Sequence, residues 1–389
     1  MTSRPAEIAS GPPLRWSALS ATGRRVLLDL LVHGPRSRIR IAERLGLSRA
    51  SLTRVARELV DGGLVLPGDM LASASRGRPA EELHLRPGAA HFVGVKVTAE
   101  RVYAVVTDLA ATVVDELEIA LASPAEGEVV DAIVEATRTL GARHGTMSAL
   151  GVGLAADVLR REGEPLVASS PLLGWSAPVP LARLLAERVG MPVTIANDVH
   201  ALTAAHHWFG SGVDHRSVVV YGVGAGIGCG VVIDDELVQG SHGRSGRVGH
   251  TRIARTGRLC TNGHPDCVHS FVSMPAIEAN AGVAPGDYAS ALERARVADG
   301  REREAFASAA YALGAAVAET VNLLDPELVS LMGEGLDMLD LAPAAFDDGL
   351  VEHLEQVPRA SVRIDRPPFA FGLYARGAAA TAIRELLSV

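Results

Sequence analysis

Between residues 37 and 65, hydrophobic and polar positions recur with the period of two short helices separated by a turn. The first apolar stripe stops at Gly46, where a glycine can end a helix. The second stripe follows the i, i+3, i+4, i+7 rule of one helix face and consists of Leu52, Val55, Ala56 and Leu59. Ser37 and Ser48 precede the stripes and can accept hydrogen bonds from the first turn of each helix. The pattern predicts a helix-turn-helix.

The polar face of the second helix is suited to nucleic acid. Arginine reads guanine edges in the major groove, and small hydroxyl side chains reach bases or phosphates. We expect DNA contacts from the residues at the leading end and open side of this helix: Ser48, Arg49, Ala50, Ser51, Thr53, Arg54 and Arg57. The alternative is an Arg-rich helical hairpin on a solvated surface.

Two short β-rich segments follow, with a basic loop between them. Leu64–Leu66 and Glu82–Leu85 can pair as strands, and the loop contains Arg76, Gly77, Arg78 and Pro79. This is the pattern of a winged helix-turn-helix, in which a compact basic tip enters a narrow minor groove because its negative potential attracts arginine. A flexible basic loop that touches only phosphates is the alternative.

From about His91 the pattern alternates between β-rich and helical segments. Strands are expected at 91–97, 101–108, 112–121, 150–154, 192–196, 216–223, 228–233, 237–239 and 328–332. Helices are expected at 128–144, 179–189, 201–209, 287–298, 302–324 and 373–387. Two halves, each with a β-hairpin followed by helices, predict an α/β fold in which a duplicated, actin-like unit surrounds a cleft.

These elements suggest a division of the chain. We expect a disordered tail at 1–19, a winged helix-turn-helix DNA-binding domain at 20–88 and an effector-sensing body at 89–389. The body divides into a small lobe, about 89–195 plus 373–389, and a large lobe, about 196–372.

Charge separates the two ends of the chain. Residues 1–90 contain fourteen Arg, no Lys and eight acidic residues, a net charge of +6, whereas the remainder carries −14. A basic head on an acidic body directs DNA affinity to the head. The whole chain has only three cysteines, Cys229, Cys260 and Cys267, which argues against a disulfide framework and for the cytoplasm. No signal-peptide pattern is visible, and no apolar run approaches the ~18 residues of a membrane span.

Four motifs in the body resemble the repressor, ORF, kinase (ROK) family, specifically its transcriptional regulators with an added winged helix. The motifs are IANDVHALTAAHHWFG (Ile195–Gly210), YGVGAGIGCGVVI (Tyr221–Ile233), GRVGH followed by CTNGHPDCVHSFVS (Gly246–His250 and Cys260–Ser273), and NLLDPELVSLMGEGL (Asn322–Leu336). The resemblance covers about residues 20–389. It implies a two-lobed, sugar-kinase-like (ASKHA) body behind the winged helix.

The residues that serve phosphoryl transfer in the family's kinases are missing. The kinases carry Asp-x-Gly-Gly-Thr after the first strand, where a carboxylate positions metal and phosphate. Here the segment is Lys96-Val97-Thr98-Ala99-Glu100, so Lys replaces the carboxylate and no glycine follows. Ala225 stands where a Thr hydroxyl is usual, and Ala155-Ala156 replaces Pro-Gly in the sugar loop. We therefore expect no ATP turnover and no enzymatic activity.

The resemblance also implies an effector site. Asn197 and Asp198 match the family's sugar-binding pair, although an Asn-Asp pair is also a common helix cap, and His250 is retained. Arg247 and His269 stand where the family has carboxylates, which favours an anionic effector, a sugar phosphate or sugar acid, over a neutral sugar. A pocket without ligand, in which Arg247 makes an internal salt bridge, is the competing interpretation.

The same region resembles the family's metal segment. One His and three Cys form a tetrahedral zinc set in the family. His250, Cys260 and Cys267 match it, but Asn262 replaces the middle cysteine, a poor substitute as ligand. A fourth ligand could come from His264, Asp266 or His269. A metal-free loop with two ordinary thiols is the alternative to Zn²⁺.

Together these features predict a DNA-binding transcriptional regulator, a repressor of carbohydrate-related genes with a catalytically inactive, effector-binding body. A homo-oligomer, a dimer or tetramer, would read palindromic double-stranded operator DNA. Two alternatives stay open. One is a sugar kinase with an accessory DNA-binding domain, and the other is a ligand-independent regulator controlled by a partner protein.

Overall fold

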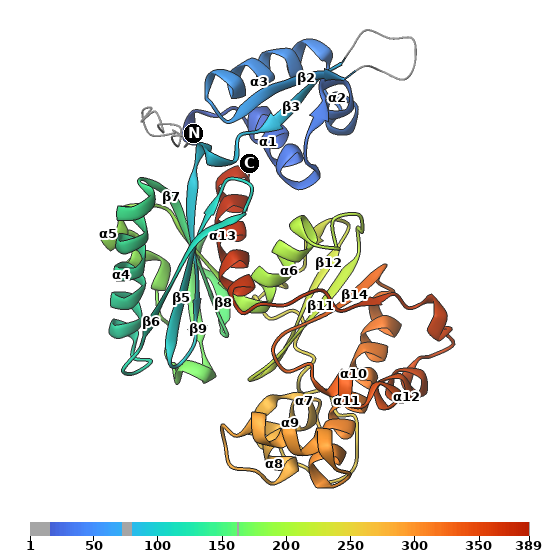
Figure 1. The fold of residues 1–389 in the computed structure, drawn as a ribbon. Coiled ribbons are helices and arrows are strands. Elements are labelled where there is room, and N and C mark those ends of the chain that lie inside the picture. The colour runs from blue at the N-terminus through green and yellow to red at the C-terminus, as the bar shows by residue number, and fades with distance from the viewer. Residues whose placement is uncertain (1–15, 72–79, 162, 389) are drawn as a thin grey trace, which may run out of the picture.

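The computed structural model describes residues 16–71, 80–161 and 163–388, and shows a small head beside a larger body (Figure 1). Residues 1–15 of the expected tail, and Arg76, Gly77 and Arg78 at the expected wing tip, lie outside the described residues. Trp16–Ala18, also within the expected tail, forms a 3₁₀ helix, and the Trp16 ring lies 5.8 Å from that of Phe92.

The head contains three helices and a three-stranded sheet of order β1-β3-β2. The elements are α1 (Ala21–His33), β1 (Arg36–Ser37), α2 (Arg38–Leu45), α3 (Arg49–Asp61), β2 (Val65–Leu71) and β3 (Ala80–Leu85). The Ser37 side chain accepts from the N–H of Arg40 and the Ser48 side chain from that of Ser51, so both expected caps are confirmed. Gly46 ends α2 in the left-handed region that favours glycine, with φ at 65°.

The head shares its hydrophobic core with the body. The expected stripe of α3 is buried together with α1 and β3, and the same cluster continues into Phe92 and the last helix of the chain. A short 3₁₀ helix, Pro87–Ala89, makes the connection. The head is therefore packed directly against the body, and the connection between them is short.

The first sheet of the body has the order β10-β7-β4-β5-β6. Its strands are β4 (His91–Val97), β5 (Arg101–Asp108), β6 (Val113–Ala120), β7 (Met147–Leu154) and β10 (Val193–Asn197). Helices α4 (Glu126–His144) and α5 (Leu181–Val189) cover one face, and α13 (Gly372–Leu387) covers the other (Figure 1). A hairpin that the sequence pattern did not indicate, β8 (Asp157–Arg161) with β9 (Glu164–Ser169), follows β7, and a 3₁₀ turn at Pro171–Leu173 follows it.

The second sheet has the order β13-β12-β11-β14-β15. Its strands are β11 (Val218–Val223), β12 (Ile227–Ile233), β13 (Glu236–Leu237), β14 (Leu328–Met332) and β15 (Ile364–Asp365). Its helices are α6 (Asp198–Phe209), α7 (His269–Val272), α8 (Met274–Ala281), α9 (Tyr288–Val297), α10 (Arg301–Leu324), α11 (Met338–Leu341) and α12 (Pro343–His353), with a 3₁₀ turn at Arg359–Ser361. Each sheet thus begins with an antiparallel hairpin and adds parallel strands, as the duplicated pattern predicted.

Two helices, α6 and α13, lie side by side between the sheets. Glycines allow α13 to approach the first sheet backbone to backbone. A Cβ at Gly94 would overlap the carbonyl of Ala375, and one at Gly151 would overlap the carbonyl of Ala378. Residues 91–197 and the C-terminal helix therefore pack together as one structural unit, although they are far apart in the sequence.

Helix α10 departs from the expectation that no segment approaches a membrane span. By length and composition alone it is apolar enough to cross a bilayer. Its alanine-rich face is buried with α8, α9 and α12 in the core of the second half, which accounts for the composition without a membrane.

Candidate functional site

The open face of α3 presents a basic surface. Arg49, Ala50, Thr53, Arg54 and Arg57 line a shallow hollow there, and all five are exposed. Within the described residues, the three arginines make no ion pair, so their guanidinium groups remain available to an external anion. Two hydroxyls of the predicted set are already used within the helix. The Ser48 hydroxyl accepts from the N–H of Ser51, and that of Thr53 donates to the carbonyl of Arg49.

Lys96 on β4 forms a buried ion pair with Asp198 at the start of α6. The two residues are 6% and 7% exposed, and the second carboxylate oxygen of Asp198 accepts from the N–H of Val199. The Lys96 ammonium also lies 4.9 Å from the ring centroid of Tyr374 on α13, a cation–π contact. Burial, and then the nearby carboxylates, raise the pKa of the Tyr374 hydroxyl. The Asp198 carboxylate is thus neutralised by the lysine that stands in place of the first-strand carboxylate of the family's kinases.

The glycine-rich turn between β11 and β12 lies against the carboxylate of Glu334. The N–H of Gly224 donates to the carbonyl of Gly226, which closes the turn. A Cβ at Gly224 would overlap the Glu334 carboxylate, and the backbone of Ala225 hydrogen-bonds to it. A phosphate held by this turn would therefore meet a carboxyl group of the chain itself, and burial raises the pKa of that Glu334 side chain.

Asn197 lies where β10 ends and α6 begins, as the sequence predicted. Its side-chain oxygen accepts from the N–H groups of Val199 and His200, and its amide donates to the carbonyl of Ala156 over 3.1 Å. Asn197 is therefore the cap of α6 and a tie to the end of β7, which leaves little of its amide for a ligand in this conformation.

Arg247 forms an ion pair with Asp157, a residue of the unexpected β8–β9 hairpin. Arg244 meets the other oxygen of the same carboxylate at 3.2 Å. Both guanidinium groups are more than half exposed, whereas the Asp157 side chain is only 15% exposed. Two arginines share one carboxylate, so the surface next to the β8–β9 hairpin keeps an excess positive charge in contact with solvent.

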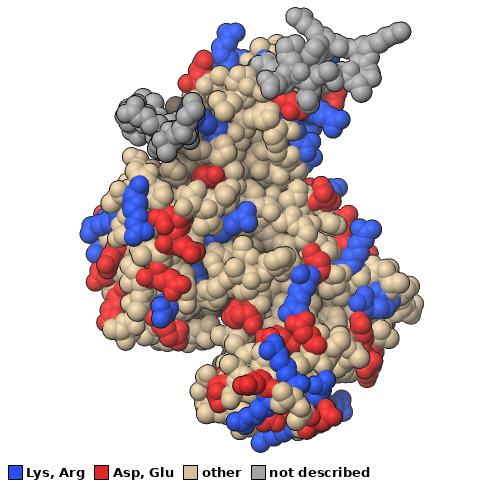
Figure 2. Space-filling view, viewed as in Figure 1, with Lys and Arg blue, Asp and Glu red and all other residues tan. Residues whose placement is uncertain are grey.

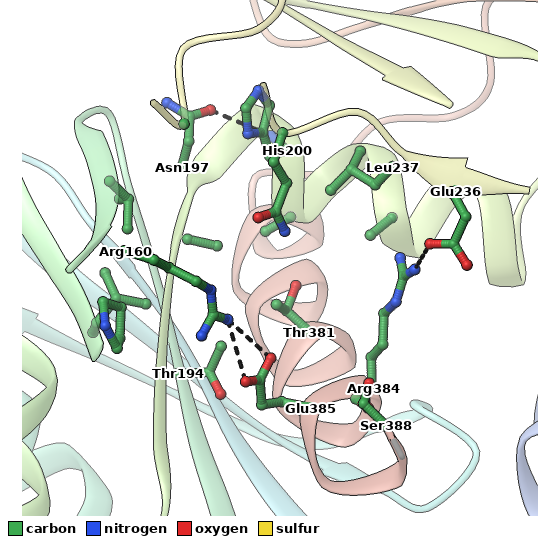
Figure 3. A pocket seen from close by; sticks show the side chains of 18 residues that line it. Arg160, Thr194, Asn197, His200, Glu236, Leu237, Thr381, Arg384, Glu385 and Ser388 are labelled. Atoms are coloured by element: carbon green, nitrogen blue, oxygen red, sulfur yellow. Dashed lines mark hydrogen bonds and ion pairs between the residues drawn. The ribbon is translucent and has the colours of Figure 1, made fainter. Parts of the chain in front are cut away.

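A cavity of about 390 Å³ lies between α6, α13, β10 and the β8–β9 hairpin (Figure 3). Of the five predicted effector residues, Asn197 lines it; the other four do not. Arg160 pairs with both oxygens of Glu385, at 3.2 and 3.1 Å, and Arg384 pairs with Glu236 at 2.6 Å. These pairs tie α13 to both halves of the body.

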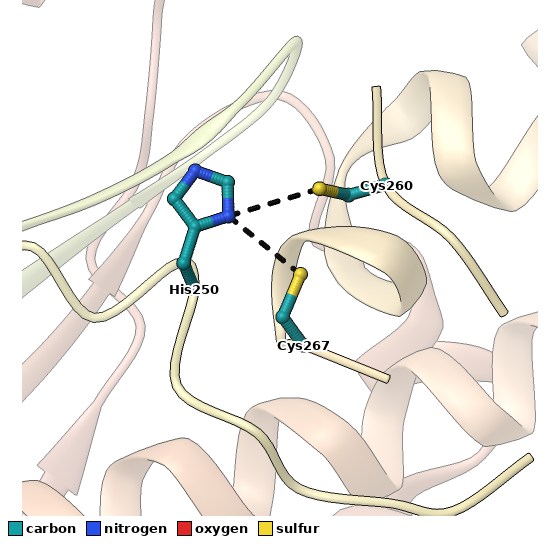
Figure 4. A group of neighbouring side chains, drawn as sticks. All are labelled: His250, Cys260 and Cys267. Atoms are coloured by element: carbon teal, nitrogen blue, oxygen red, sulfur yellow. Dashed lines mark hydrogen bonds between the residues drawn. The ribbon is translucent and has the colours of Figure 1, made fainter. Parts of the chain in front are cut away.

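His250, Cys260 and Cys267 come together as the sequence predicted (Figure 4). Their ligand atoms lie within 4.8 Å of one another, and His250 Nδ1 is 3.8 Å from Cys260 Sγ and 3.7 Å from Cys267 Sγ. Both cysteines are buried, whereas His250 is exposed. One imidazole and two thiols at this spacing are a donor set that can hold a metal ion.

His269 lies beside this cluster on α7. Its ring stacks on that of His250, with 5.6 Å between centroids and 21° between planes. Burial lowers the pKa of His269, and its Nδ1 has no hydrogen-bond partner among the described residues. The lowered pKa favours a neutral His269 ring. This ring packs on the His250 ring of the cluster.

Sequence reasoning missed three features of the body. They are the pairing of Lys96 with Asp198, the carboxylate of Asp157 beside Arg244 and Arg247, and the carboxyl group of Glu334 beside the glycine-rich turn. A signal existed for the first, because a lysine within an apolar strand needs a buried carboxylate and the motif order offered Asp198. Asp157 and Glu334 follow apolar segments without any pattern of their own.

Blue and red side chains are interleaved over the lower part of the body (Figure 2). Residues 91–389 carry a net charge of −14. Most of their arginines lie next to an Asp or Glu side chain, which gives the mixed surface.

Comparison with known proteins gives a consistent result. A family model described as the ROK family matches residues 92–385. The chain is 27% identical, over 81% of its own length and 84% of the relative, to a putative xylose repressor of Caldicellulosiruptor sp. (strain Rt8B.4). The solved structure of a ROK family transcriptional regulator, a homologue of E. coli Mlc, superposes with a TM-score of 0.78 at 23% identity and covers 95% of this chain and 97% of that one. A ROK family glucokinase from Streptomyces griseus, in complex with glucose and AMPPNP, covers 76% of this chain and all of its own, with a TM-score of 0.65 and 26% identity.

Proposed function

The chain belongs to the ROK family, and from this premise we propose that it is a DNA-binding repressor of carbohydrate-related genes that acts in the cytoplasm. Residues 20–88 would be the winged helix-turn-helix domain, preceded by the tail at 1–19. Residues 89–389 would form the two-lobed sensing body. The observation that carries the proposal is the exposed arginine face of α3, which makes no ion pair within the described residues and lies beside a body with the family's fold.

The test is selection of duplexes from a random library by the full-length protein. Anisotropy titrations should then compare a selected duplex with its scrambled sequence. A specific repressor binds the selected duplex roughly 10³-fold tighter or more. A palindromic selected sequence would support a symmetric dimer. Equal affinity for both duplexes would contradict the proposal.

We further propose that the body does not transfer phosphate. The Asp198 carboxylate is neutralised by Lys96, and the glycine-rich turn lies against the Glu334 side chain. The alternative, a sugar kinase with an accessory DNA-binding domain, predicts ATP consumption with glucose, xylose or N-acetylglucosamine. Turnover above background that disappears in Asp198→Asn would establish that alternative.

For the effector we propose a small anion of the sugar phosphate or sugar acid class. Asn197, Asp198, Arg247, His250 and His269 remain the proposed contacts. The support is the pair of exposed arginines that share Asp157, because an incoming phosphate or carboxylate can take up the surplus donors as charge-assisted hydrogen bonds.

Thermal-shift measurements with matched compounds test this effector proposal. Each neutral sugar is compared with its phosphate and its acid, in the native protein and in Arg247→Ala. Stabilisation by the anionic member, lost in Arg247→Ala, supports the proposal. Stabilisation by the neutral sugar in both proteins contradicts it. No stabilisation by any compound favours a regulator that a partner protein controls.

We also propose that Zn²⁺ is the resident ion of the His250, Cys260 and Cys267 cluster. Two buried thiols and an imidazole favour zinc over the harder cations. An ion there would hold the long segment before α7 to the core of the second half. Metal analysis of the purified protein tests the assignment.

A further inference from the structure

We propose that His264 is the fourth ligand of this metal cluster and that Asn262, which stands in place of the family's cysteine, acts behind it by orienting His250. The inference rests on the zinc assignment made above. It deepens that assignment, because no matching family residue predicts a ligand at position 264.

The distances carry the first half of the proposal. His264 Nδ1 lies 3.1 Å from His250 Nδ1 and 3.7 Å from Cys260 Sγ. His250 Nδ1 in turn lies 3.8 and 3.7 Å from the two thiol sulfurs, so His264 borders the group formed by His250, Cys260 and Cys267. Zinc bonds of about 2.0–2.1 Å to nitrogen and 2.3 Å to sulfur require edges of about 3.3–3.8 Å in a tetrahedron. These four separations, of 3.1 to 3.8 Å, lie close to that range.

The backbone explains why residue 264 can reach the cluster. The N–H of Gly263 donates to the carbonyl of Cys260, and the N–H of Cys260 donates to the carbonyl of His264. Gly263 has a φ of +78°, in the region that favours glycine. The turn brings His264 back beside Cys260 and leaves Asn262 on its outer side.

The other two candidates, Asp266 and His269, make no described contact with either thiol. The carboxylate of Asp266 is buried and accepts hydrogen bonds from the backbone of Thr256, Gly257 and Arg258. The ring of His269 stacks on the face of the His250 ring and makes no described contact with either thiol. His264 is thus the candidate whose ligand atom lies beside both His250 and Cys260.

Asn262 contacts the opposite side of His250. Its amide nitrogen, Nδ2, lies 3.3 Å from His250 Nε2. When Nδ1 binds a metal, Nε2 of the neutral ring must carry the proton and needs an acceptor. The amide supplies one when its oxygen faces Nε2, and the two ends of an amide have the same shape. Asn262 is therefore a positioning residue that fixes the tautomer and direction of His250.

This arrangement changes the charge of the cluster. Two thiolates and two neutral imidazoles balance Zn²⁺, whereas three thiolates and one imidazole leave a charge of −1.

The experiment uses the full-length protein and reads zinc content, zinc affinity by competition with a chromophoric chelator, and the visible spectrum of the Co²⁺-substituted protein. We expect one zinc per chain and a tetrahedral cobalt spectrum with two thiolates. Asn262→Ala should weaken affinity by about 10–100-fold, the usual effect of removing an outer partner of a ligand. His264→Ala should weaken it more and change the cobalt bands.

Two further variants complete the test. His264→Cys should retain zinc and intensify the thiolate-to-cobalt charge-transfer band, which shows position 264 in the coordination shell even if His264→Ala fails to fold. His242→Ala, an exposed histidine of the same segment, should change nothing. Unchanged affinity and bands in both position-264 variants would overturn this inference while leaving zinc in place. A wild-type protein without zinc under metal-replete conditions would instead overturn the zinc assignment itself.

Discussion

Arg49, Arg54 and Arg57 stand on α3 with exposed guanidinium groups and no described ion pair, whereas Lys96 and Asp198 are buried against each other between the two sheets of the body. A charge that is to meet an external partner must stay solvated and unpaired, because pairing within the chain would have to be undone on binding. A charge inside a protein must be neutralised by the chain. The contrast separates a charged surface that is open to an external partner from a buried pair that the chain neutralises by itself.

The largest expected effect comes from breaking the buried pair. Lys96→Ala leaves the Asp198 carboxylate buried without its cation, and the loss of one partner of a buried pair costs about 3–5 kcal/mol of unfolding free energy. Urea denaturation measures the loss. The double variant Lys96→Met/Asp198→Asn should recover much of it, since neither charge then remains.

A matched control is Arg188→Ala, which removes an exposed ion pair with Asp131. Exposed pairs contribute at most about 1 kcal/mol. If Lys96→Ala cost no more than this control, the cleft would not depend on its internal neutralisation, and the contrast with α3 would lose its basis.

The next effect concerns the opposite region. Arg54→Ala should weaken binding to the selected duplex by about 1–3 kcal/mol if Arg54 makes a bidentate base contact. The loss on scrambled DNA should be much smaller, and the folding stability should not change, because Arg54 is exposed. Anisotropy titrations on both duplexes measure the difference. Equal losses would show that Arg54 only neutralises phosphate.

A smaller effect is expected from His33 at the end of α1. Burial, and then the positive charges of Arg44 and Arg36, lower the pKa of His33 to about 4. The unfolded chain therefore binds this proton more readily between about pH 4 and 6.5, and stability falls as the pH drops through that window.

His33→Asn removes this titration. The variant should lose less stability than the native protein when the pH falls from 7 to 5, by on the order of 1 kcal/mol after allowance for solvent screening. Denaturation at both pH values gives the difference. If both proteins lost the same unfolding free energy between pH 7 and pH 5, the head would tolerate a further positive charge.

The smallest effect on stability is expected from Asp157→Asn. It frees Arg244 and Arg247, both largely exposed, so the cost should stay below about 1 kcal/mol. Affinity for an anionic ligand should increase because its internal competitor is gone. Calorimetry with inorganic phosphate and with a sugar phosphate would detect the gain, and an unchanged or weaker affinity would argue against an anion site.

Helices α2 and α3 of the head could be predicted because their signals are local, whereas α1 and β1 were not predicted. Caps at Ser37 and Ser48, the stop at Gly46 and the stripe on α3 each depend on neighbours within a few positions. The strands of the body were also recognisable, although the short β8–β9 hairpin was not, since its residues show no clean alternation.

The chemistry of the cleft was less accessible. Lys96 and Asp198 are 102 positions apart, and only the packing of α6 against the first sheet brings them together. The pairing of Arg247 with Asp157 was considered only as an alternative, with no partner named. Motif order located Asn197 and the metal residues, but not which of their atoms the chain already uses.

Helix α13 has a mechanical consequence. It contains 16 residues, a length of about 24 Å. Near its first turn Tyr374 lies over Lys96, and just beyond its last turn the carbonyl of Ser388 accepts from Arg24 of the head over 3.3 Å. Because the helix is seated on glycines of the first sheet, it has little room to roll or bend. We expect it to behave as a rigid helix. A movement of the two sheets relative to each other near Tyr374 would then also move the end of the helix that contacts the head.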